Sequence, residues 1–386
     1  MIVIVGAGQA AAQLVLSLRQ GGCKEPIRMI GDEPYAPYQR PPLSKKFLAQ
    51  RPPADTLYFR PEKFWPEQGV TAEYGVLVES IDRANKRVSF NGGQAEYSTL
   101  FLSTGTHARP LPIPGAKLSG VFSLRRIDDV RALRGPLDTA KRIVIVGGGY
   151  IGLEVAAVAR GEGRDVTVLE AEDRVMKRVT SPVISAFMQD FHRNRGVNIR
   201  LGARLATIEG EKRVAQVRLA DGAALPADLV LLAVGAKPND DLAAAAGLAC
   251  DDGVLVDEYG RTVDPAIYAA GDCTRFPSRR YGRKLRLECV QNAIDQAKAV
   301  AAAILGKPQP YDPVPWFWSD QYELKLQMAG LSEGYDDAQT VGDVAAAHFS
   351  VEYRRHGKLI AVDAVNDGRA YMSGRKRIAQ ETEAAS

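Results

Sequence analysis

The fold is decided by Ile2-Val3-Ile4-Val5-Gly6-Ala7-Gly8-Gln9-Ala10-Ala11 and by its counterpart Ile143-Val144-Ile145-Val146-Gly147-Gly148-Gly149-Tyr150-Ile151-Gly152. In both stretches a β-branched run leads into a G-x-G-x-x-G/A turn and then into a helical pattern. The first glycine permits a tight bend, the second lets a pyrophosphate approach the backbone, and the third position lets helix and strand pack closely. Two such units predict two dinucleotide sites. The candidate contacts are Gly6, Gly8, Ala10 and Ala11 in the first turn, and Gly147, Gly149, Tyr150, Ile151 and Gly152 in the second.

A second strand follows each helix and ends at an acidic residue. Residues 27–30 lead to Asp32, and residues 166–169 lead to Glu170. A carboxylate at this position accepts hydrogen bonds from ribose hydroxyls and repels a 2′-phosphate, so Glu170 favours NADH over NADPH. The alternative is a solvated loop acid, because further acids follow it directly, and the nearby Arg174 is a cation that could receive a phosphate.

Composition excludes several classes of protein. The 386 residues are 46% hydrophobic and 25% charged, which is typical of a globular chain with more than one domain. The four cysteines form no C-x-x-C motif, so we expect a reducing compartment and no disulfide framework. No His/Cys spacing is typical of a metal site, and no apolar stretch approaches the roughly 20 residues of a membrane helix. We therefore expect a cytoplasmic protein without metal.

Local patterns predict the remaining elements. Residues 70–90 and 95–103 are expected to form short strands around a hairpin turn at Asn91-Gly92-Gly93. Ser181-Pro182 is typical of a helix start, and the helix should run to about residue 194. Strands are expected at residues 197–201, 214–219, 228–234, 348–355 and 358–365. Beyond Ser373 the chain turns basic and then polar, and we expect it to fray.

Three further segments complete a recognisable set. Phe101-Leu102-Ser103-Thr104-Gly105 and residues 231–239, which include Gly235, are strands that end in glycine turns, and Asp272 closes Ala269-Ala270-Gly271-Asp272. In this order, with the two glycine turns, the chain resembles the pyridine-nucleotide reductases that carry FAD and NAD(P)H on two dinucleotide domains. The resemblance implies an α/β fold with two Rossmann-like domains, glutathione-reductase-like, plus a small α+β C-terminal domain. We predict an FAD domain of residues 1–108 and 240–308, an NADH domain of residues 109–239, and a C-terminal domain of residues 309–386.

The putidaredoxin reductase family is the subfamily that the chain resembles most. The similarity lies in Pro41-Pro42-Leu43-Ser44-Lys45, in the second glycine turn with Glu154 after it, and in residues 315–322. It implies an NADH-dependent FAD enzyme that reduces a small, acidic [2Fe-2S] ferredoxin for a cytochrome P450 or a ring-hydroxylating dioxygenase. We expect no nucleic-acid or membrane partner, and a monomer or weak homodimer.

The resemblance also carries site residues onto this chain. It implies FAD contacts at Ala10, Asp32, Lys45, Val78, Thr104, Gly105, Arg125, Asp272, Val290 and Trp318, and NADH contacts at the second glycine turn, Glu170 and Gly235. It implies that Lys45 and Glu154 form an ion pair that tunes the flavin. Without it, the residues alone would indicate a surface lysine and a helix-face glutamate.

Other residues leave alternatives open. Trp316, Phe317, Trp318 and Tyr322 form an aromatic cluster that is either the core of the last domain or a path for electrons. The basic run Arg279, Arg280, Arg283, Lys284 and Arg286 is either a solvated loop or a docking rim for an acidic ferredoxin, together with Arg60 and Lys298. Two other functions remain: a redox-tuned flavoprotein that acts mainly by binding, and a reductase of rubredoxin or small radical acceptors. No cysteine lies between Ile30 and Lys46, which argues against disulfide reduction.

Overall fold

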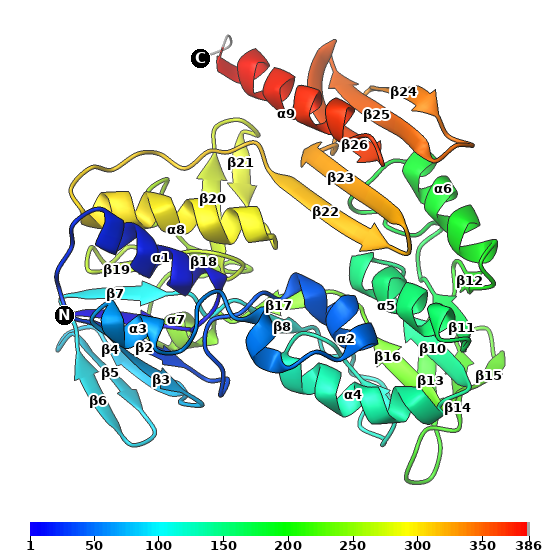
Figure 1. Cartoon of the computed structure of the whole chain (residues 1–386), viewed down its shortest axis with the longest axis horizontal. Helices are drawn as coiled ribbons and strands as arrows, with labels where there is room; N and C mark the ends of the chain where they lie inside the picture. The colour runs from blue at the N-terminus through cyan, green and yellow to red at the C-terminus, as the bar shows by residue number, and fades with distance from the viewer. Residues whose placement is uncertain (384–386) are drawn as a thin grey trace. The chain divides into compact units, whose positions relative to one another are not determined.

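Two compact units make up the structure, a computed structural model that describes residues 1–383 (Figure 1). The first unit contains Met1–Gln39, Pro53–His107 and Lys237–Pro315, and the second contains Arg40–Pro52, Ala108–Ala236 and the residues from Trp316 onward. Each unit holds one glycine turn at the end of a central strand of a parallel sheet. This arrangement confirms the predicted α/β fold with two Rossmann-like domains.

The first unit is built on a five-stranded parallel sheet in the order β19-β7-β1-β2-β3. The strands are β1 (Ile2–Val5), β2 (Ile27–Gly31), β3 (Val70–Tyr74), β7 (Thr99–Leu102) and β19 (Ile267–Ala269). Val5 lies opposite Ile30 on one side and opposite Leu102 on the other, so the chain leaves β1 where the sheet order switches direction. A ligand crevice is expected at this point of a doubly wound sheet.

Smaller elements complete the first unit. They are α1 (Gln9–Gln20), η2 (Ala54–Leu57), α3 (Phe64–Glu67), β4 (Val78–Asp82), β5 (Arg87–Phe90), β6 (Gly93–Glu96), α7 (Asp241–Ala245), β18 (Val254–Leu255), β20 (Thr274–Ser278), β21 (Arg283–Leu285) and α8 (Val290–Ile304). The predicted hairpin is present, with Phe90 opposite Gly93 and Gly92 at a φ of 97°. The short strands β8 (Thr106–Ala108) and β17 (Ala236–Pro238) lie where the chain passes between the units.

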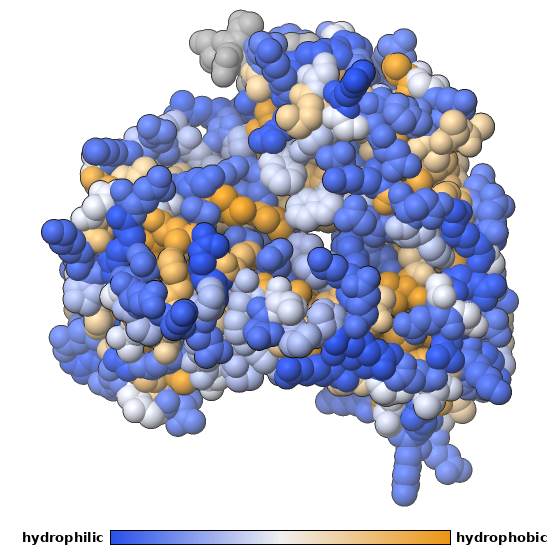
Figure 2. All heavy atoms as spheres, in the orientation of Figure 1, coloured by the Kyte–Doolittle hydropathy of each residue, from blue (hydrophilic) through white to orange (hydrophobic). Residues whose placement is uncertain are grey.

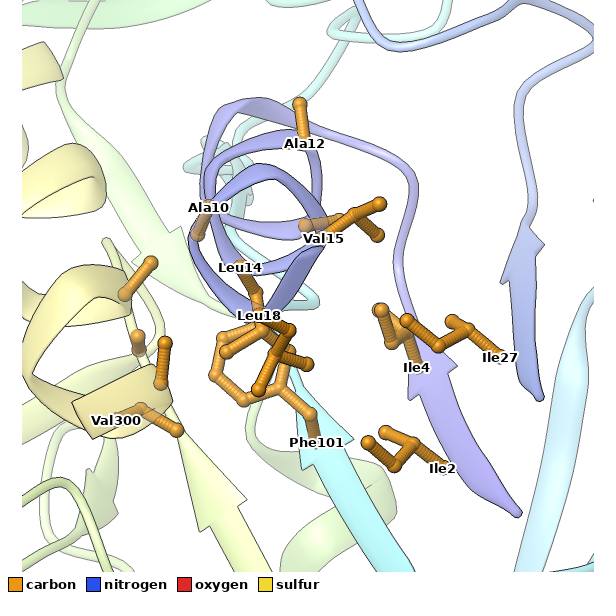
Figure 3. Close-up of a cluster of buried hydrophobic side chains, with 14 of the residues drawn as sticks. Ile2, Ile4, Ala10, Ala12, Leu14, Val15, Leu18, Ile27, Phe101 and Val300 are labelled. Atoms are coloured by element: carbon orange, nitrogen blue, oxygen red, sulfur yellow. The ribbon is translucent and has the colours of Figure 1, made fainter. Parts of the chain in front are cut away.

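The core of the first unit lies between its sheet and the helices α1 and α8, which pack side by side (Figures 1 and 3). Ile2, Ile4 and Phe101 project from the strands toward Leu14 and Leu18 of α1, and all five are fully buried. The two helices meet through small residues, mainly alanines. Alanine lets helix axes approach closely, which holds the start of α1 firmly against the sheet.

The second unit repeats this plan with the sheet order β12-β11-β10-β16-β9. Its strands are β9 (Val121–Phe122), β10 (Arg142–Val146), β11 (Asp165–Leu169), β12 (Asn198–Arg200) and β16 (Leu229–Leu232). Around it lie η1 (Pro41–Ser44), α2 (Lys46–Gln50), α4 (Ile127–Thr139), α5 (Tyr150–Gly161), α6 (Pro182–Arg193), β13 (Leu205–Glu209), β14 (Gln216–Leu219) and β15 (Ala224–Pro226). α6 begins at Pro182 after Ser181, as the sequence predicts.

A five-stranded antiparallel sheet and one helix close the second unit. The sheet order is β22-β23-β26-β25-β24, from β22 (Trp316–Gln321), β23 (Leu324–Gly330), β24 (Asp337–Asp343), β25 (His348–Arg355) and β26 (Lys358–Val365). β25 and β26 coincide with the two predicted C-terminal strands. The expected fraying after Ser373 is wrong for the described residues, because α9 (Gly368–Glu383) packs on β26 with Tyr371 and Ile378 buried and Arg377 paired with Glu352. The expectation also covers residues 384–386, which lie outside the described residues.

Asp363 is a buried carboxyl group of β26. Its Oδ2 accepts hydrogen bonds from Thr180 Oγ1 at 2.5 Å and from the Tyr353 hydroxyl at 2.7 Å. Burial raises the pKa of Asp363 to about 6, although both hydrogen bonds act in the opposite direction. The pKa in the unfolded chain is about 3.9, so folding binds a proton, and the stabilisation is lost as the pH rises through about 6.

We therefore expect Asp363→Asn to flatten the pH dependence of stability. Between about pH 4 and pH 7.5 the wild type should lose about 2 kcal/mol more unfolding free energy than the variant, because asparagine has no charge to bury. Denaturant unfolding at both pH values measures this, with Asp337→Asn on the exposed strand β24 as control. Parallel curves for wild type and Asp363→Asn would show that Asp363 does not titrate in this range.

Hydrophilic residues cover most of the face in Figure 2, and hydrophobic residues appear there only in separate clusters. Among the described residues, no helix has the length and apolar character needed to cross a bilayer. Cys23, Cys250, Cys273 and Cys289 are all unpaired, as expected from their spacing.

Candidate functional site

The two glycine turns have the same geometry. Gly6 and Gly147 have φ angles of 103° and 107°, and a Cβ on either would lie 2.3 Å from a carbonyl oxygen, that of Ser103 or Ala233. These two positions therefore require glycine for the turn itself. The third position is Gly152 in the second turn, where a Cβ would lie 2.1 Å from the Gly147 carbonyl, and the fully buried Ala11 in the first.

The middle glycines are different, because no contact with a described residue would prevent a side chain there. Gly8 and Gly149 are extended, with φ of −107° and −82°, and a Cβ on either would meet no atom within 4 Å. Each immediately precedes a twelve-residue helix without a side-chain cap and without an acidic residue in its first turn. The unpaired N–H groups of such a helix start favour a phosphate. Open space in front of them fits a dinucleotide in each cradle.

Glu170 is held against the second glycine turn. Its Oε2 accepts from the Gly148 backbone N–H at 2.7 Å, and its Oε1 accepts from the Glu172 N–H at 3.0 Å. The carboxylate is therefore fixed beside the cradle, unlike a freely solvated loop acid. Arg174 donates to the Thr180 and Lys177 carbonyls and to Ser185 Oγ, so it is engaged in holding the following loop. Asp32, the corresponding acid of the first unit, is exposed.

Three predicted flavin contacts lie at the same end of the first sheet. Thr104 Oγ1 donates to the Asn239 carbonyl at 2.7 Å, and Asn239 Nδ2 donates back to the Thr104 carbonyl at 2.7 Å. Gly105, at a φ of 67°, accepts from the Asn239 N–H. Asp272 follows Gly271, whose added Cβ would lie 3.5 Å from Cβ of Ala10, so the Asp272 turn adjoins the start of α1.

Gln296 is a structural support of this turn that the sequence did not single out. Its fully buried side chain accepts through Oε1 from the Gly271 N–H and from Thr274 Oγ1, both at 2.8 Å. The sequence feature that could have indicated this role is a polar residue on the face of α8 that packs on the core. Val290 is the first residue of α8, and Val78 is a buried residue at the start of β4.

The remaining predicted flavin contacts, Lys45, Arg125 and Trp318, belong to the second unit. Lys45 Nζ lies 2.7 Å from Glu154 Oε2, which gives the ion pair that the resemblance implied. Glu154 is only 4% exposed, and such a buried charge must be paired and hydrogen-bonded. Arg125 donates its backbone N–H to Asp129 Oδ2 at 2.8 Å, ahead of α4.

The aromatic cluster is divided by the pleat of β22. Trp316 and Trp318 contact each other with ring centroids 5.8 Å apart, and Arg375 of α9 lies over Trp316. Phe317 faces the other way and packs on Tyr150, one of the predicted NADH contacts, with centroids 4.4 Å apart. The Tyr150 hydroxyl donates to Met328 Sδ on β23. Tyr322 was wrongly grouped with the tryptophans: it contacts Phe191 and His192 of α6.

Two predicted NADH contacts lie beside the second cradle. Ile151 is exposed in the first turn of α5, and Gly235 has a φ of 102°. An added Cβ on Gly235 would lie 3.6 Å from the Arg178 guanidinium. Arg178 is an exposed cation near this glycine, at a place where a cofactor phosphate could approach.

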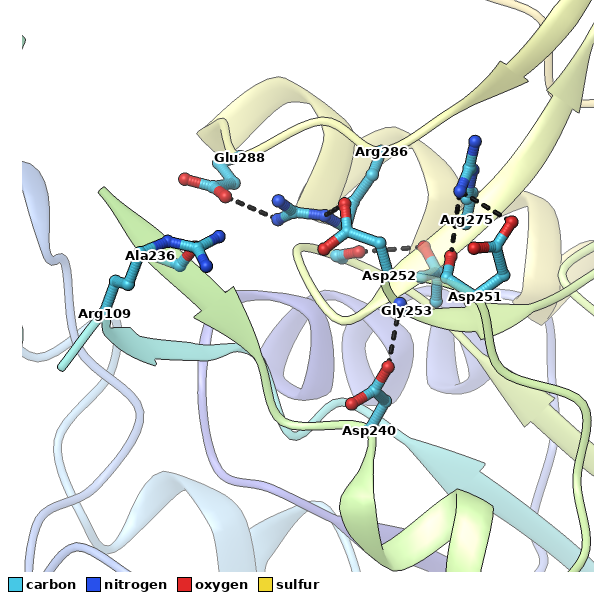
Figure 4. A network of polar contacts seen from close by, with 11 residues as sticks. Arg109, Ala236, Asp240, Asp251, Asp252, Gly253, Arg275, Arg286 and Glu288 are labelled. Atoms are coloured by element: carbon cyan, nitrogen blue, oxygen red, sulfur yellow. Dashed lines mark hydrogen bonds and ion pairs between the residues drawn. The ribbon is translucent and has the colours of Figure 1, made fainter. Parts of the chain in front are cut away.

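The basic run is only partly available to a partner. Figure 4 shows Arg286 between two acids; it lies 3.0 Å from Asp252 and also pairs with Glu288, and its side chain is 14% exposed. Arg279 is 77% exposed although it lies 3.2 Å from Glu258, and Arg283 and Lys284 on β21 are exposed. The same figure shows Asp251 paired with Arg275. The exposed part of the run is thus Arg279, Arg283 and Lys284.

Comparisons with known proteins cover almost the whole chain. Residues 1–297 match the family described as pyridine nucleotide-disulphide oxidoreductase, and residues 316–386 match the family described as reductase C-terminal. The chain is 44% identical to rhodocoxin reductase of Rhodococcus erythropolis, over 98% of this chain and 90% of that protein. Among solved structures, a ferredoxin reductase from Rhodopseudomonas palustris has a TM-score of 0.95 at 44% identity, with 97% and 93% of the two chains covered. The covalent putidaredoxin reductase–putidaredoxin complex has a TM-score of 0.94 at 41% identity, with 98% and 92% covered.

Proposed function

Because the chain belongs to the pyridine nucleotide-disulphide oxidoreductase family, we propose that it is an FAD-containing, NADH-dependent ferredoxin reductase. The observation that carries this conclusion is the pair of matching cradles, in which Gly8 and Gly149 leave open space before two helix starts. NADH supplies two electrons as a hydride, and FAD accepts the pair and passes electrons on singly. One NADH is therefore balanced by two ferredoxins, with NAD⁺ and one proton as the other products.

The residues of the first unit support its role as the FAD-binding domain. Gly6 and Gly8 shape the cradle, Asp272 lies beside the start of α1, and Thr104 with Gly105 is locked to Asn239. The second cradle, with Glu170 bonded to its turn, supports NADH binding. The division into residues 1–108 with 240–308, 109–239 and 309–386 stays part of the proposal, as do a cytoplasmic location and a monomer or weak homodimer.

Ferredoxin is favoured over the alternatives by the relatives whose names include it. A disulfide substrate is disfavoured, because no cysteine lies between residues 30 and 46. Among the described residues, no cluster of three or more His, Cys, Asp or Glu side chains could hold a metal ion. We further propose that the partner ferredoxin is acidic and supplies a cytochrome P450 or a ring-hydroxylating dioxygenase. Measuring NADH oxidation with purified ferredoxins tests the function.

Glu170 should set the preference for NADH. Glu170→Ala removes an acceptor for the ribose hydroxyls and a charge that repels a 2′-phosphate, so the kcat/KM ratio of NADH to NADPH should fall about tenfold to a hundredfold. Steady-state kinetics with both cofactors and an artificial electron acceptor measure this ratio. The control is Glu172→Ala, which removes an exposed acid paired with Lys177. An unchanged ratio in Glu170→Ala would reduce Glu170 to a support of the glycine turn.

Charge reversal on the basic run should weaken ferredoxin capture. We expect Arg279→Glu/Arg283→Glu/Lys284→Glu to raise the ferredoxin KM about tenfold at low salt and to flatten its salt dependence, because attraction between opposite patches is screened over about 8–10 Å at physiological salt. Reduction of the flavin by NADH should not change. The matched control reverses Lys24, Lys86 and Lys307, which are also exposed. If both triple variants alter the ferredoxin KM equally, only net charge matters; if neither does, Arg60 and Lys298 are the next candidates.

A further inference from the structure

The Glu154 carboxylate is surrounded by three hydrogen donors from two segments that are distant in sequence. Lys45 Nζ lies 2.7 Å from Oε2, and Ser44 Oγ donates to the same oxygen at 2.5 Å. Ser319 Oγ of β22 donates to Oε1 at 2.6 Å. Both carboxylate oxygens are therefore engaged, although Ser319 is 165 residues away in sequence. The resemblance implied only the Lys45 contact, so the Ser44 and Ser319 hydroxyls are two further donors.

A directed chain of hydrogen bonds fixes the orientation of that hydroxyl. His192 Nε2 lies 2.8 Å from Gln321 Oε1, and Gln321 Nε2 donates to Ser319 Oγ at 3.1 Å. Because Ser319 Oγ accepts from Gln321, its own hydrogen is left for Glu154. Burial lowers the pKa of His192, and its Nδ1 is buried without a partner, so the neutral ring donates through Nε2. Every hydrogen in the chain thus points toward the carboxylate.

The pleat of the C-terminal sheet brings these residues to one face. Phe317, Ser319 and Gln321 alternate along β22, and they contact Tyr150, Glu154 and His192, respectively. Residues two apart in a strand share a face, so a single register presents the whole polar chain to α5 and α6. Ser319 and Gln321 are each 1% exposed. Two buried polar residues on a core-facing strand are costly unless they are hydrogen-bonded, and this chain supplies those bonds.

The carboxylate of Glu154 receives donors at both of its oxygens. A carboxylate only accepts hydrogen bonds, and Lys45, Ser44 and Ser319 supply the donors. Within residues 1–383, Lys45 has one further acceptor, the Pro41 carbonyl at 3.2 Å, which leaves one of its three N–H groups for a ligand. The titratable groups around this carboxylate are Lys45, Tyr150 on its own helix, and His192 at the far end of the hydrogen-bond chain. Burial raises the pKa of Tyr150, and the charges of Asp363 on β26 and of Glu154 act in the same direction.

We propose that Ser319 is a positioning residue for the reductive half-reaction: held by Gln321 and His192, it fixes the Glu154 carboxylate and thereby aims the Lys45 ammonium group. The C-terminal domain then takes part in reduction by NADH. This inference rests on the proposed function only in that NADH reduces the bound FAD. It requires no particular electron acceptor.

The test compares Ser319→Ala with wild type in the FAD-loaded protein. Loss of the Ser319 hydrogen bond to the ion-paired carboxylate should slow flavin reduction by NADH about tenfold. Independently of activity, infrared difference spectra should show a shifted carboxyl band of Glu154, because this group loses one of its hydrogen donors. Glu154→Gln assigns this band by its loss. Ser319→Thr keeps the hydroxyl and should restore both readouts.

The matched control is Ser350→Ala, which removes another buried serine from the same sheet without touching Glu154. Normal FAD content in each variant verifies folding. The proposal is overturned if Ser319→Ala leaves the infrared carboxyl band of Glu154 unchanged, or if Ser350→Ala shifts it equally. In the Glu154→Gln background, Ser319→Ala should have no further effect on the rate. Failure of the wild type to reduce ferredoxin would contradict the proposed function alone, since the infrared result does not depend on it.

Discussion

The Gly149→Leu protein is expected to purify with a full complement of FAD and to be reduced by NADH at least about a hundredfold more slowly than wild type. Gly149 is extended, and its added Cβ would meet no protein atom within 4 Å, so leucine does not clash with the fold. The leucine side chain would instead fill the space before α5. There it would block the approach of the NADH pyrophosphate to the backbone N–H groups.

Stopped-flow reduction measures this effect, with dithionite as the control reductant. Dithionite does not need the cradle, so it should reduce the flavin of wild type and variant alike. The matched variant is Gly161→Leu at the opposite end of the same helix, where an added Cβ also meets no atom within 4 Å. It should behave as wild type. Normal reduction of Gly149→Leu by NADH would show that the second cradle does not bind NADH.

Gly8→Leu is expected to give the opposite result, a folded protein that has lost most of its FAD. Gly8 is extended and open in the same way, and it precedes α1 of the first unit. Leucine there should weaken FAD binding at least about a hundredfold, because the pyrophosphate can no longer reach the start of the helix. The FAD content per chain after gel filtration measures the loss, and circular dichroism verifies the fold. A stoichiometric FAD content in Gly8→Leu would show that the first turn does not hold the flavin.

The two glycine variants test each other. Each cradle is predicted for one cofactor only, so Gly149→Leu should keep its FAD while Gly8→Leu loses it. If Gly149→Leu lost the FAD and Gly8→Leu kept it, the assignments of the two cradles would be reversed. The Gly161→Leu control makes this comparison independent of the general cost of a bulky side chain at an open glycine.

Local patterns were sufficient to predict both cradles. The β-branched runs, the glycines and the helical patterns lie within ten residues of one another, and Gly6 and Gly147 adopt the positive φ that such turns require. The start of α6 at Pro182 and the strands β25 and β26 were also evident from sequence. Each of these features depends on neighbours along the chain, where sequence periodicity is informative.

Features set by tertiary contacts were not predictable in this way. A fraying tail was expected in place of helix α9 because most residues of this segment are polar. Two of its apolar residues, Tyr371 and Ile378, are nevertheless buried. Gln296 and Ser319 gained their roles from partners on distant segments, Gly271 and Glu154. Tyr322 was misplaced since a positive φ of 53° directs the chain away from the tryptophans at the end of β22. The pair of Lys45 with Glu154 was expected only through family resemblance, because the two residues are 109 positions apart.

The most direct test of the account is steady-state NADH oxidation by the purified FAD-loaded protein with and without an acidic [2Fe-2S] ferredoxin. We predict saturable stimulation by the ferredoxin, two ferredoxins reduced per NADH, and a rate that falls as salt is raised. Rubredoxin and a small radical acceptor serve as comparisons at equal concentration. NADH oxidation that no ferredoxin stimulates, or that rubredoxin or the radical acceptor supports with a higher kcat/KM, would contradict the assignment of ferredoxin as the electron acceptor.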